Sequence, residues 1–390
     1  MTQKLFYEDS FLKTFSAQVL ECCPVGDGYR IVLDRTAFFP EGGGQYADHG
    51  YLDQIRVEDV QEEDGKIYHM TKESIEPGTC VKGTIDWEER FMKMQQHTGE
   101  HIVSGLVHER FHYRNVGFHL GSENCTMDFN GELTKEELHE IELRANEAVF
   151  QNLEIQVLYP TEEELQKIEY RSKIEIRGQV RIVVVPGYDV CACCAPHVKH
   201  TGEIGLIKLT NVQRYKGGVR VTMLCGSRAL QDYDRKLSAA KQIGAALCAK
   251  EDEIAEAVFH LQEECAQWKQ KLQRQQMELL RWKADAVDPG EEFVCLFEED
   301  LEGEAPRLLM NQVLDAGHHF CAVFTKGQGD MYRYVIGSRT FSLREPVKEL
   351  NAAFGGRGGG KPEMVQGTLH GSEEELRAWI QKKARMLKNE

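Results

Sequence analysis

Two pairs of residues in this sequence could bind a metal ion. His97 and His101 occur in the run His-Thr-Gly-Glu-His, and Cys193 and His197 occur in the run Cys-Cys-Ala-Pro-His. Three residues separate the members of each pair. On a helix this spacing places both side chains on one face, one turn apart. Zinc binds imidazole nitrogen and thiolate sulfur tetrahedrally, so these four residues predict a Zn²⁺ centre.

Residues beside these pairs leave other chemistry open. Cys191 and Cys194 are further thiols that compete with Cys193 as the sulfur ligand. Cys193 or Cys194 with His197 could instead act as a nucleophile and its base. Glu100, between the two histidines, is a candidate general base for a metal-bound water. Loss of activity on chelation or on alkylation would separate the metal enzyme from the cysteine nucleophile.

The composition is that of an ordinary soluble globular protein. Of the 390 residues, 41% are hydrophobic and 28% are charged. The first residues lack the pattern of a signal peptide, and no apolar run approaches the ~20 residues that span a bilayer. The twelve cysteines are therefore predicted to be reduced thiols and metal ligands in a cytoplasmic protein.

The charge pattern limits the partners. A net charge of −16 argues against a protein that coats nucleic acid non-specifically. Between Arg171 and Arg228, however, ten Lys and Arg stand against three Asp and Glu, a surplus of seven. A basic surface beside the metal site suits an anionic substrate. Acids from elsewhere in the fold could also neutralise this stretch.

The elements that must position these residues predict an α+β chain. Residues 1–90 contain short strands broken by Gly, Asp and Pro, which favour a small N-terminal β-barrel or sandwich. Residues 91–228 form a core with a mostly antiparallel sheet, and a helix from Trp87 to about Phe111 carries the two histidines. Capping boxes at Thr134 and Thr161 start two further helices.

The last part of the chain is predicted to be a long helix followed by a separate α/β domain. Between 229 and 287, apolar residues recur at alternating steps of three and four, which is typical of a coiled coil, as one continuous helix or a hairpin. Residues 288–390 then alternate strands and helices. Their run Gly355–Lys361 nearly fits a phosphate-binding loop, but Pro362 replaces the hydroxyl residue that would hold Mg²⁺. Arg357 and Lys361 could still bind nucleic-acid phosphates, or the run is a tight turn.

Four segments, in this order, resemble the editing half of alanyl-tRNA synthetase and its free-standing relatives, the AlaX proteins of the long form. They are Leu33–Gln45, Gln96–His101, Cys193–Gly205 and Gly355–Met364. The resemblance covers nearly the whole chain. It makes residues 91–228 a zinc-containing editing core and residues 288–390 a glycine-rich, DHH-associated domain. The synthetase places its activation domain before this region, so the resemblance implies hydrolysis without charging.

The resemblance also implies roles for single residues. His97, His101, Cys193 and His197 would hold the zinc, although the family usually has Cys-Gly-Gly-Thr-His where this chain has Cys-Cys-Ala-Pro-His. Thr36 would contact a seryl side chain. The pocket would be shaped by Gly42, Gly43, Gly44 and Gln45 of the first segment and by His119, which lies outside the four segments. His200 is a further neighbour of the site.

The function implied is that of a trans-editing hydrolase that removes serine, or glycine, from mischarged alanine tRNA at a zinc site. Arg357 and Lys361 would contact the tRNA. The helical segment or the last domain could form a homodimer, or the helix could hold the last domain at a distance that matches the tRNA. Two alternatives remain at this point. One is a non-catalytic RNA-binding protein whose structural zinc is closed by four protein ligands. The other is a metallo-esterase that edits a different mischarged tRNA.

Overall fold

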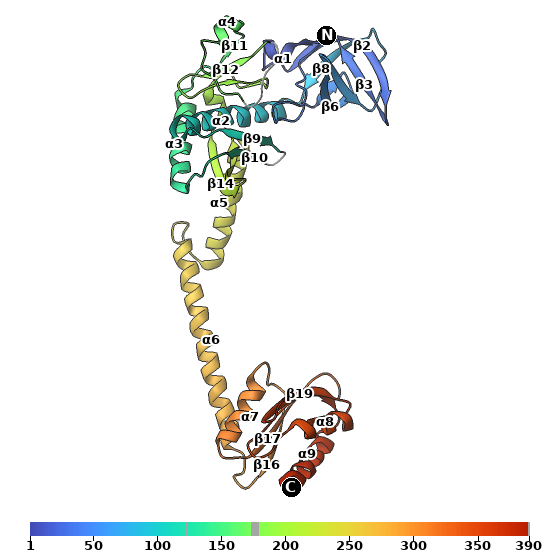
Figure 1. Cartoon of the computed structure of the whole chain (residues 1–390), viewed down its shortest axis with the longest axis vertical. Coiled ribbons are helices and arrows are strands. Elements are labelled where there is room, and N and C mark those ends of the chain that lie inside the picture. Colours follow the sequence, from blue (N-terminus) through green and yellow to red (C-terminus); the bar gives the residue numbers. More distant parts are fainter. Residues whose placement is uncertain (122–123, 173–178, 389–390) are drawn as a thin grey trace. The chain divides into compact units, whose positions relative to one another are not determined.

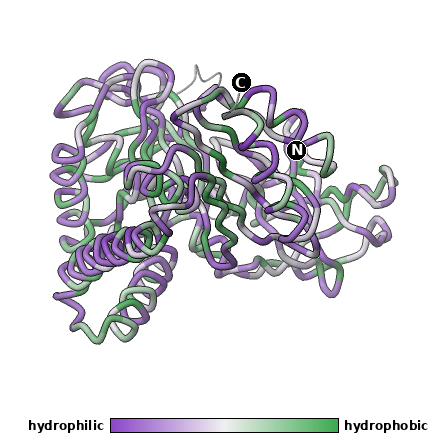
Figure 2. Tube along the Cα trace, turned by 90° about the horizontal axis from the view of Figure 1, so that it is seen from below, coloured by the Kyte–Doolittle hydropathy of each residue, from purple (hydrophilic) through white to green (hydrophobic). Residues whose placement is uncertain are grey.

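The computed structural model describes residues 1–121, 124–172 and 179–388, and it contains two compact units, Met1–Gln242 and Ile243–Glu390 (Figure 1). Both units combine helices with sheets that are largely antiparallel, so the predicted mixed class is confirmed. Figure 2 shows hydrophilic and hydrophobic residues interleaved along the trace. None of the helices among these residues is long and apolar enough to cross a bilayer.

The first unit begins with a closed barrel. Its strands follow the order β2-β3-β7-β6-β5-β8. Along β2 the side chains of Phe15, Ala17 and Val19 are buried and alternate with exposed residues, because successive strand side chains point to opposite faces. The barrel strands are β2 (Thr14–Val25), β3 (Gly28–Leu33), β5 (Gly50–Leu52), β6 (Ile55–Glu63), β7 (Lys66–Thr71) and β8 (Cys80–Ile85). Before and beside it lie α1 (Leu5–Glu8) and the parallel pair β1 (Gln3–Lys4) and β4 (Arg35–Thr36).

A long helix, α2 (Trp87–Phe111), follows the barrel and runs through the core of the first unit. Glu88 and Glu89 in its first turn complement the positive end of the helix dipole. The helix ends at His112, whose φ of 58° is left-handed. Sixteen of its residues are buried, because strands of both neighbouring sheets, a 3₁₀ turn and the next helix pack around it.

Two antiparallel sheets complete this core. One has the order β14-β15-β10-β9 and the other β11-β12-β13. The capping boxes predicted at Thr134 and Thr161 both form and start α3 and α4. The elements are β9 (Asn115–Leu120), β10 (Cys125–Phe129), α3 (Lys135–Gln151), β11 (Gln156–Leu158), α4 (Glu162–Leu165), β12 (Ile182–Val185), β13 (Asp189–Ala192), the 3₁₀ turn Thr201–Ile204, β14 (Ile207–Tyr215) and β15 (Gly218–Cys225).

The predicted long helix is broken. The structure has α5 (Ser227–Leu247) and α6 (Ile254–Asp285), with a turn between them in which Cys248 adopts a left-handed φ of 53°. Gly244 lets the chain turn back at close range: a Cβ there would lie 3.1 Å from the carbonyl oxygen of Ala249. A continuous helix through 229–287 is therefore wrong, and coiled-coil pairing stays a prediction.

The second unit ends in a five-stranded sheet of order β16-β17-β18-β20-β19. Only β16 and β17 are parallel, with α7 between them in the chain. The run Gly355–Lys361 is not a phosphate-binding loop. Gly355, with a φ of 58°, lies in a tight turn after α8, and Arg357–Lys361 form the edge strand β19. It pairs with β20 at a glycine-to-glycine contact, and a Cβ on Gly358 would meet the Tyr334 hydroxyl at 2.3 Å. The elements are β16 (Phe293–Glu298), α7 (Ala305–Asp315), β17 (Phe320–Lys326), β18 (Met331–Ser338), α8 (Arg344–Ala353), β19, β20 (Met364–His370) and α9 (Glu373–Lys388).

Candidate metal centre

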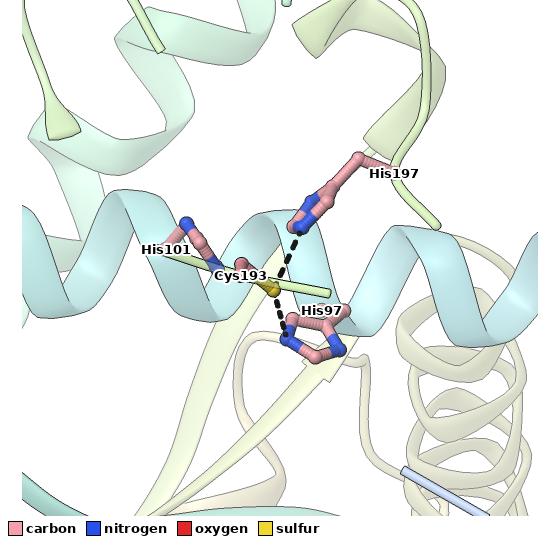
Figure 3. Close-up of side chains that lie close together, drawn as sticks. All are labelled: His97, His101, Cys193 and His197. Atoms are coloured by element: carbon pink, nitrogen blue, oxygen red, sulfur yellow. Dashed lines mark hydrogen bonds between the residues drawn. The ribbon is translucent and has the colours of Figure 1, made fainter. Parts of the chain in front are cut away.

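The four predicted metal ligands come together in the first unit. His97 and His101 lie on α2, one turn apart, while Cys193 and His197 lie in the loop after β13 (Figure 3). This loop is held between two hydrophobic clusters, since Cys193 packs against both the barrel core and the α2 core. The three imidazoles are buried. The loop thus brings a thiol to the imidazoles of α2 from 96 residues further along the sequence than His97.

Their donor atoms are close enough to share one ion. The four ligand atoms lie within 4.8 Å of one another. The Cys193 Sγ atom is 3.5 Å from His97 Nε2 and 3.4 Å from His197 Nε2 (Figure 3). Three imidazoles and one thiolate are ligand types that zinc binds. The chemistry of this donor set therefore fits Zn²⁺.

Each imidazole is also oriented by a second polar group. The Nδ1 atom lies against an oxygen in all three rings: Gln45 Oε1 at 3.1 Å for His97, Asp189 Oδ2 at 3.0 Å for His101 and Thr98 Oγ1 at 3.0 Å for His197. Metal-binding histidines in proteins are usually held in this way, which fixes the tautomer and the ring plane. The Nε2 atom of each ring is therefore the nitrogen that remains to bind a metal ion.

The pKa values of the thiols separate the three candidate sulfur ligands. Burial opposes ionisation of Cys193, but the adjacent His97, His197 and His101 overcome it and hold its pKa well below the usual range. Burial raises the pKa of Cys194 to about 11 and raises that of Cys191 as well. Thiolate is the form that binds a metal, so Cys193 is the favoured ligand.

Cys191 belongs to a second group of potential ligands, with His101 and Asp189. The Asp189 carboxylate is already engaged there, since Arg171 donates to both of its oxygens at 2.7 and 3.0 Å. Against burial, contact with His101 and Arg171 lowers the pKa of Asp189. Asp189 of this group therefore orients His101 through its Nδ1 atom, and the group does not form a separate metal site.

The comparisons with known proteins agree with this arrangement. Residues 180–222, which include Cys193 and His197, match the family model "Threonyl and Alanyl tRNA synthetase second additional domain", and residues 5–89 match "tRNA synthetases class II (A)". The alanyl-tRNA editing protein AlaX-L of Pyrococcus horikoshii is 27% identical, over 96% of both chains. The chain is a relative of the alanyl-tRNA editing proteins. The resemblance predicted from the four sequence segments is confirmed.

Alanine–tRNA ligases are also similar to nearly the whole of this chain. Those of Pyrococcus abyssi and Pyrococcus furiosus are 30% and 31% identical over 94% and 96% of this chain. The chain spans 42% of the length of each ligase. A crystal structure of the C-Ala domain from Aquifex aeolicus alanyl-tRNA synthetase matches 24% of this chain and 89% of that domain, at 21% identity and a TM-score of 0.21.

The glycine segment Gly42–Gln45 of this protein reaches the candidate metal centre. Gln45 contacts His97, and a Cβ on Gly43 would lie 3.5 Å from the Cys194 sulfur and 4.0 Å from the His97 ring. Gly44 has a left-handed φ of +81°, and a Cβ there would meet the carbonyl oxygen of Phe118 at 2.5 Å. Only glycine fits this close approach.

Thr36 is fully buried at the end of the barrel. Its hydroxyl lies 2.8 Å from His69 Nε2 and accepts a hydrogen bond from the Phe38 backbone N–H at 3.1 Å. Burial lowers the pKa of His69 to about 4, so this ring is neutral at neutral pH. Within the described residues, the hydrogen bonds of Thr36 do not reach the four ligands.

Two other predicted site residues lie outside the metal cluster. The buried carboxylate of Glu100 accepts hydrogen bonds from Ser104 and Asn115, both at 2.6 Å, and is not among the groups that can share an ion. This engagement does not support Glu100 as a general base. His119 is exposed on β9 and faces Asp128, with Nε2 4.0 Å from the carboxylate.

The basic stretch is less basic in the fold than in the sequence. Five of its ten cations pair with acids, namely Arg171, Lys199, Lys208, Arg214 and Arg220. Arg181 is buried and donates to the carbonyl oxygens of Cys193 and Ala195 at 2.8 and 3.0 Å. Lys173 and Arg177 lie outside the described residues. Partners from other elements therefore pair with or bury these six side chains, as the alternative interpretation of the charge pattern predicted, while Arg214 stays 86% exposed.

Sequence reasoning missed residues that orient the ligands and Thr36. Asp189, Thr98 and His69 have no motif of their own, since their partners lie far away in the chain. Thr98 had one local signal, its position directly after His97 on a buried helix face. Arg357 and Lys361, in the second unit, are exposed on the edge strand β19.

Proposed function

We propose that this protein is a zinc-dependent hydrolase that removes serine, or glycine, from mischarged alanine tRNA. One observation carries the proposal. His97, His101, Cys193 and His197 can share one ion in a chain that is similar, over 96% of its length, to an alanyl-tRNA editing protein.

The four residues would hold the zinc, and their supports would keep them in place. Asp189, Gln45 and Thr98 orient the three rings, and Arg181 fixes the loop that carries Cys193 and His197. When bound, zinc supplies a Lewis acid that polarises an ester carbonyl or lowers the pKa of a water. An aminoacyl ester is already activated, so positioning supplies much of what its hydrolysis requires.

Thr36 would select the amino acid because its hydroxyl oxygen can accept a hydrogen bond from serine but not from alanine. His69 Nδ1 lies 3.1 Å from the Ile31 carbonyl oxygen, which can only accept, so this nitrogen carries the ring proton. His69 Nε2 then accepts from the Thr36 hydroxyl, and the Phe38 N–H occupies one lone pair of that oxygen. The remaining lone pair can accept a hydrogen bond from a seryl hydroxyl. An alanyl methyl group would leave it unpaired, at a cost of about 1–3 kcal/mol.

Contacts to the tRNA would come from phosphate-binding side chains. Arg357 and Lys361 are exposed on a strand whose three intervening residues are glycines, so a nucleic-acid backbone can approach it closely. Such contacts release counterions, and binding would weaken as the salt concentration rises.

A non-catalytic RNA-binding protein with a structural zinc is the second candidate. It is favoured by the number of protein donors, since four ligands can close a tetrahedron. Deacylation assays on seryl-, glycyl- and alanyl-tRNA, with the metal-loaded and the chelated protein, separate the two. Zinc-dependent release of serine with alanine retained supports the hydrolase. Tight tRNA binding without release of any amino acid supports the structural zinc.

A further inference from the structure

One face of α2 lies along the segment that contains the glycine motif. Arg90, Lys93 and His97 are spaced at i, i+3 and i+7, so they project from the same side of the helix. All three contact the segment 37–48. Arg90 binds Asp48 and the Ala37 carbonyl, Lys93 donates to the Ala47 carbonyl at 2.5 Å, and His97 contacts Gln45.

Arg90 makes the most extensive of these contacts. It is 1% exposed, as is Asp48. Its Nε donates to the Asp48 carboxylate at 2.8 Å, and one terminal nitrogen donates to the same carboxylate. That terminal nitrogen also donates to the Ala37 carbonyl at 2.6 Å. The other terminal nitrogen donates to the Ser10 carbonyl at 3.2 Å. One guanidinium thus holds three separate pieces of the chain.

Asp48 passes this constraint to the glycine segment. Its carboxylate accepts from the Phe39 backbone N–H at 2.7 Å, and its own N–H donates to the Phe39 carbonyl at 2.9 Å. These bonds join the two arms of the segment at its base. At the tip, Gly42 and Gln45 exchange two backbone hydrogen bonds of 3.0 Å. A shift of Arg90 relative to Asp48 would therefore move the tip relative to His97.

Stability alone does not explain a buried pair of this kind. Replacing a buried ion pair with well-packed apolar side chains is often neutral or stabilising, because the desolvation of two charges is costly. The donors of one rigid guanidinium do, however, fix the positions of their acceptors relative to one another, here one Asp48 oxygen and the Ala37 and Ser10 carbonyls. Arg90 is seven residues before His97 on a rigid helix, so it fixes the segment relative to the metal ligands.

We propose that Arg90 is a positioning residue that holds the segment 37–48 at one register along α2 and so sets the preference of the site for a seryl over an alanyl ester. The inference rests on the proposed function, since it assigns the selectivity of that same site. Arg90 acts through Asp48 and Ala37 and does not itself touch the substrate.

The test measures binding of two non-hydrolysable substrate analogues. They are the seryl and alanyl amides of 3′-aminoadenosine, titrated calorimetrically into the zinc-loaded full-length protein. The main variant combines Arg90→Met with Asp48→Asn, because removing both charges avoids an unpaired buried carboxylate. We expect it to retain its zinc and its circular-dichroism spectrum, while the seryl-to-alanyl affinity ratio falls by about tenfold, the worth of one misplaced hydrogen bond.

Arg56→Met is the matched control. Arg56 also joins the barrel to the start of α2, through a 2.7 Å ion pair with Asp86, but it has no hydrogen bond to the segment 37–48 among the described residues. Its affinity ratio should equal that of the unaltered protein, and Arg90→Lys should give an intermediate ratio. A double variant that keeps the full seryl preference would overturn the inference alone. Equal binding of both analogues by the unaltered protein would overturn the proposed function as well.

Discussion

At the scale of single residues, the proposed metal ligands and the proposed selecting residue, Thr36, occupy separate hydrogen-bond networks. The ligands are oriented by Gln45, Asp189 and Thr98, whereas Thr36 is oriented by His69. Substitutions in one network should therefore leave the property governed by the other largely unchanged. This separation makes three predictions testable one side chain at a time.

Replacing Thr36 with Val should erode the preference for seryl-tRNA over alanyl-tRNA more than it lowers the zinc content. Valine has nearly the shape of threonine but cannot accept the seryl hydroxyl, so the discrimination should fall by about tenfold or more. Deacylation rates on both substrates and zinc analysis by atomic absorption measure the two properties. Equal losses of both would contradict the assigned role.

Asp189→Asn should weaken zinc binding. The amide cannot carry the negative charge that faces His101 and Arg171, and loss of such a partner typically lowers metal affinity about 10–100-fold. Competition with a chromogenic chelator measures the affinity. Asp128→Asn, which removes a carboxylate that pairs with Arg220 and is not among the potential ligands, is the control and should not change it.

His69 should make the fold sensitive to acid. Burial lowers its pKa from 6.5 to about 4, so below pH 6.5 the unfolded chain binds a proton that the folded one does not. The free energy of unfolding should therefore fall as the pH drops from about 6.5 to about 4, by about 3 kcal/mol in total for this group. Urea unfolding at several pH values measures it. His69→Gln should flatten this part of the profile; a variant with the same slope as the parent would exclude His69 as its source.

At the scale of elements, the glycine segment shows why some positions tolerate a side chain and others do not. Gly44 has a left-handed backbone and a carbonyl oxygen in the place of a Cβ, while at Gly42 the nearest atoms to a Cβ are 3.9 Å away. We expect Gly44→Ala to reduce deacylation strongly and lower stability by at least about 1 kcal/mol. Gly42→Ala should behave like the parent protein. Parallel thermal melts and rates check both, and similar effects of the two would contradict the structure here.

The elements that carry the site could be predicted where local sequence signals exist. The helix with His97 and His101 and the capping boxes at Thr134 and Thr161 follow from spacing and cap residues. The place of the break between α5 and α6 and the edge strand at Arg357–Lys361 could not be predicted. The break lies at a close local contact between Gly244 and Ala249. The strand depends on its pairing with β20, whereas its glycines alone favour a turn.

The same limit applies to the site. Four ligands could be proposed because their types and spacing are chemically distinctive. Asp189 and Thr98 could not, since only the fold brings them to the rings. Gln45 was predicted to shape the pocket, but its contact with His97 was not. The charge surplus of the basic stretch was misleading for a related reason: the acids that pair with Lys208 and Arg220 come from α3 and β10.

At the scale of the whole molecule, α6 leaves an apolar seam uncovered within the described chain. Trp268, Leu272 and Trp282 are each at least 66% exposed. Their heptad spacing predicts pairing with a second copy. Leu272→Glu should convert a dimer to a monomer in sedimentation-velocity experiments, while Gln273→Glu, off the seam, should not. A parent protein that is monomeric at tens of micromolar would refute the pairing.

The loop that bears Cys193 belongs to two hydrophobic clusters at once, one inside the barrel and one around α2. The barrel supplies none of the four donors, yet its core packs against the loop that carries two of them. We therefore expect removal of the barrel to weaken zinc binding although all four proposed ligands remain in the chain. If the barrel and the remainder of the chain were produced as two separate polypeptides, mixing them should restore the zinc affinity when the two parts associate.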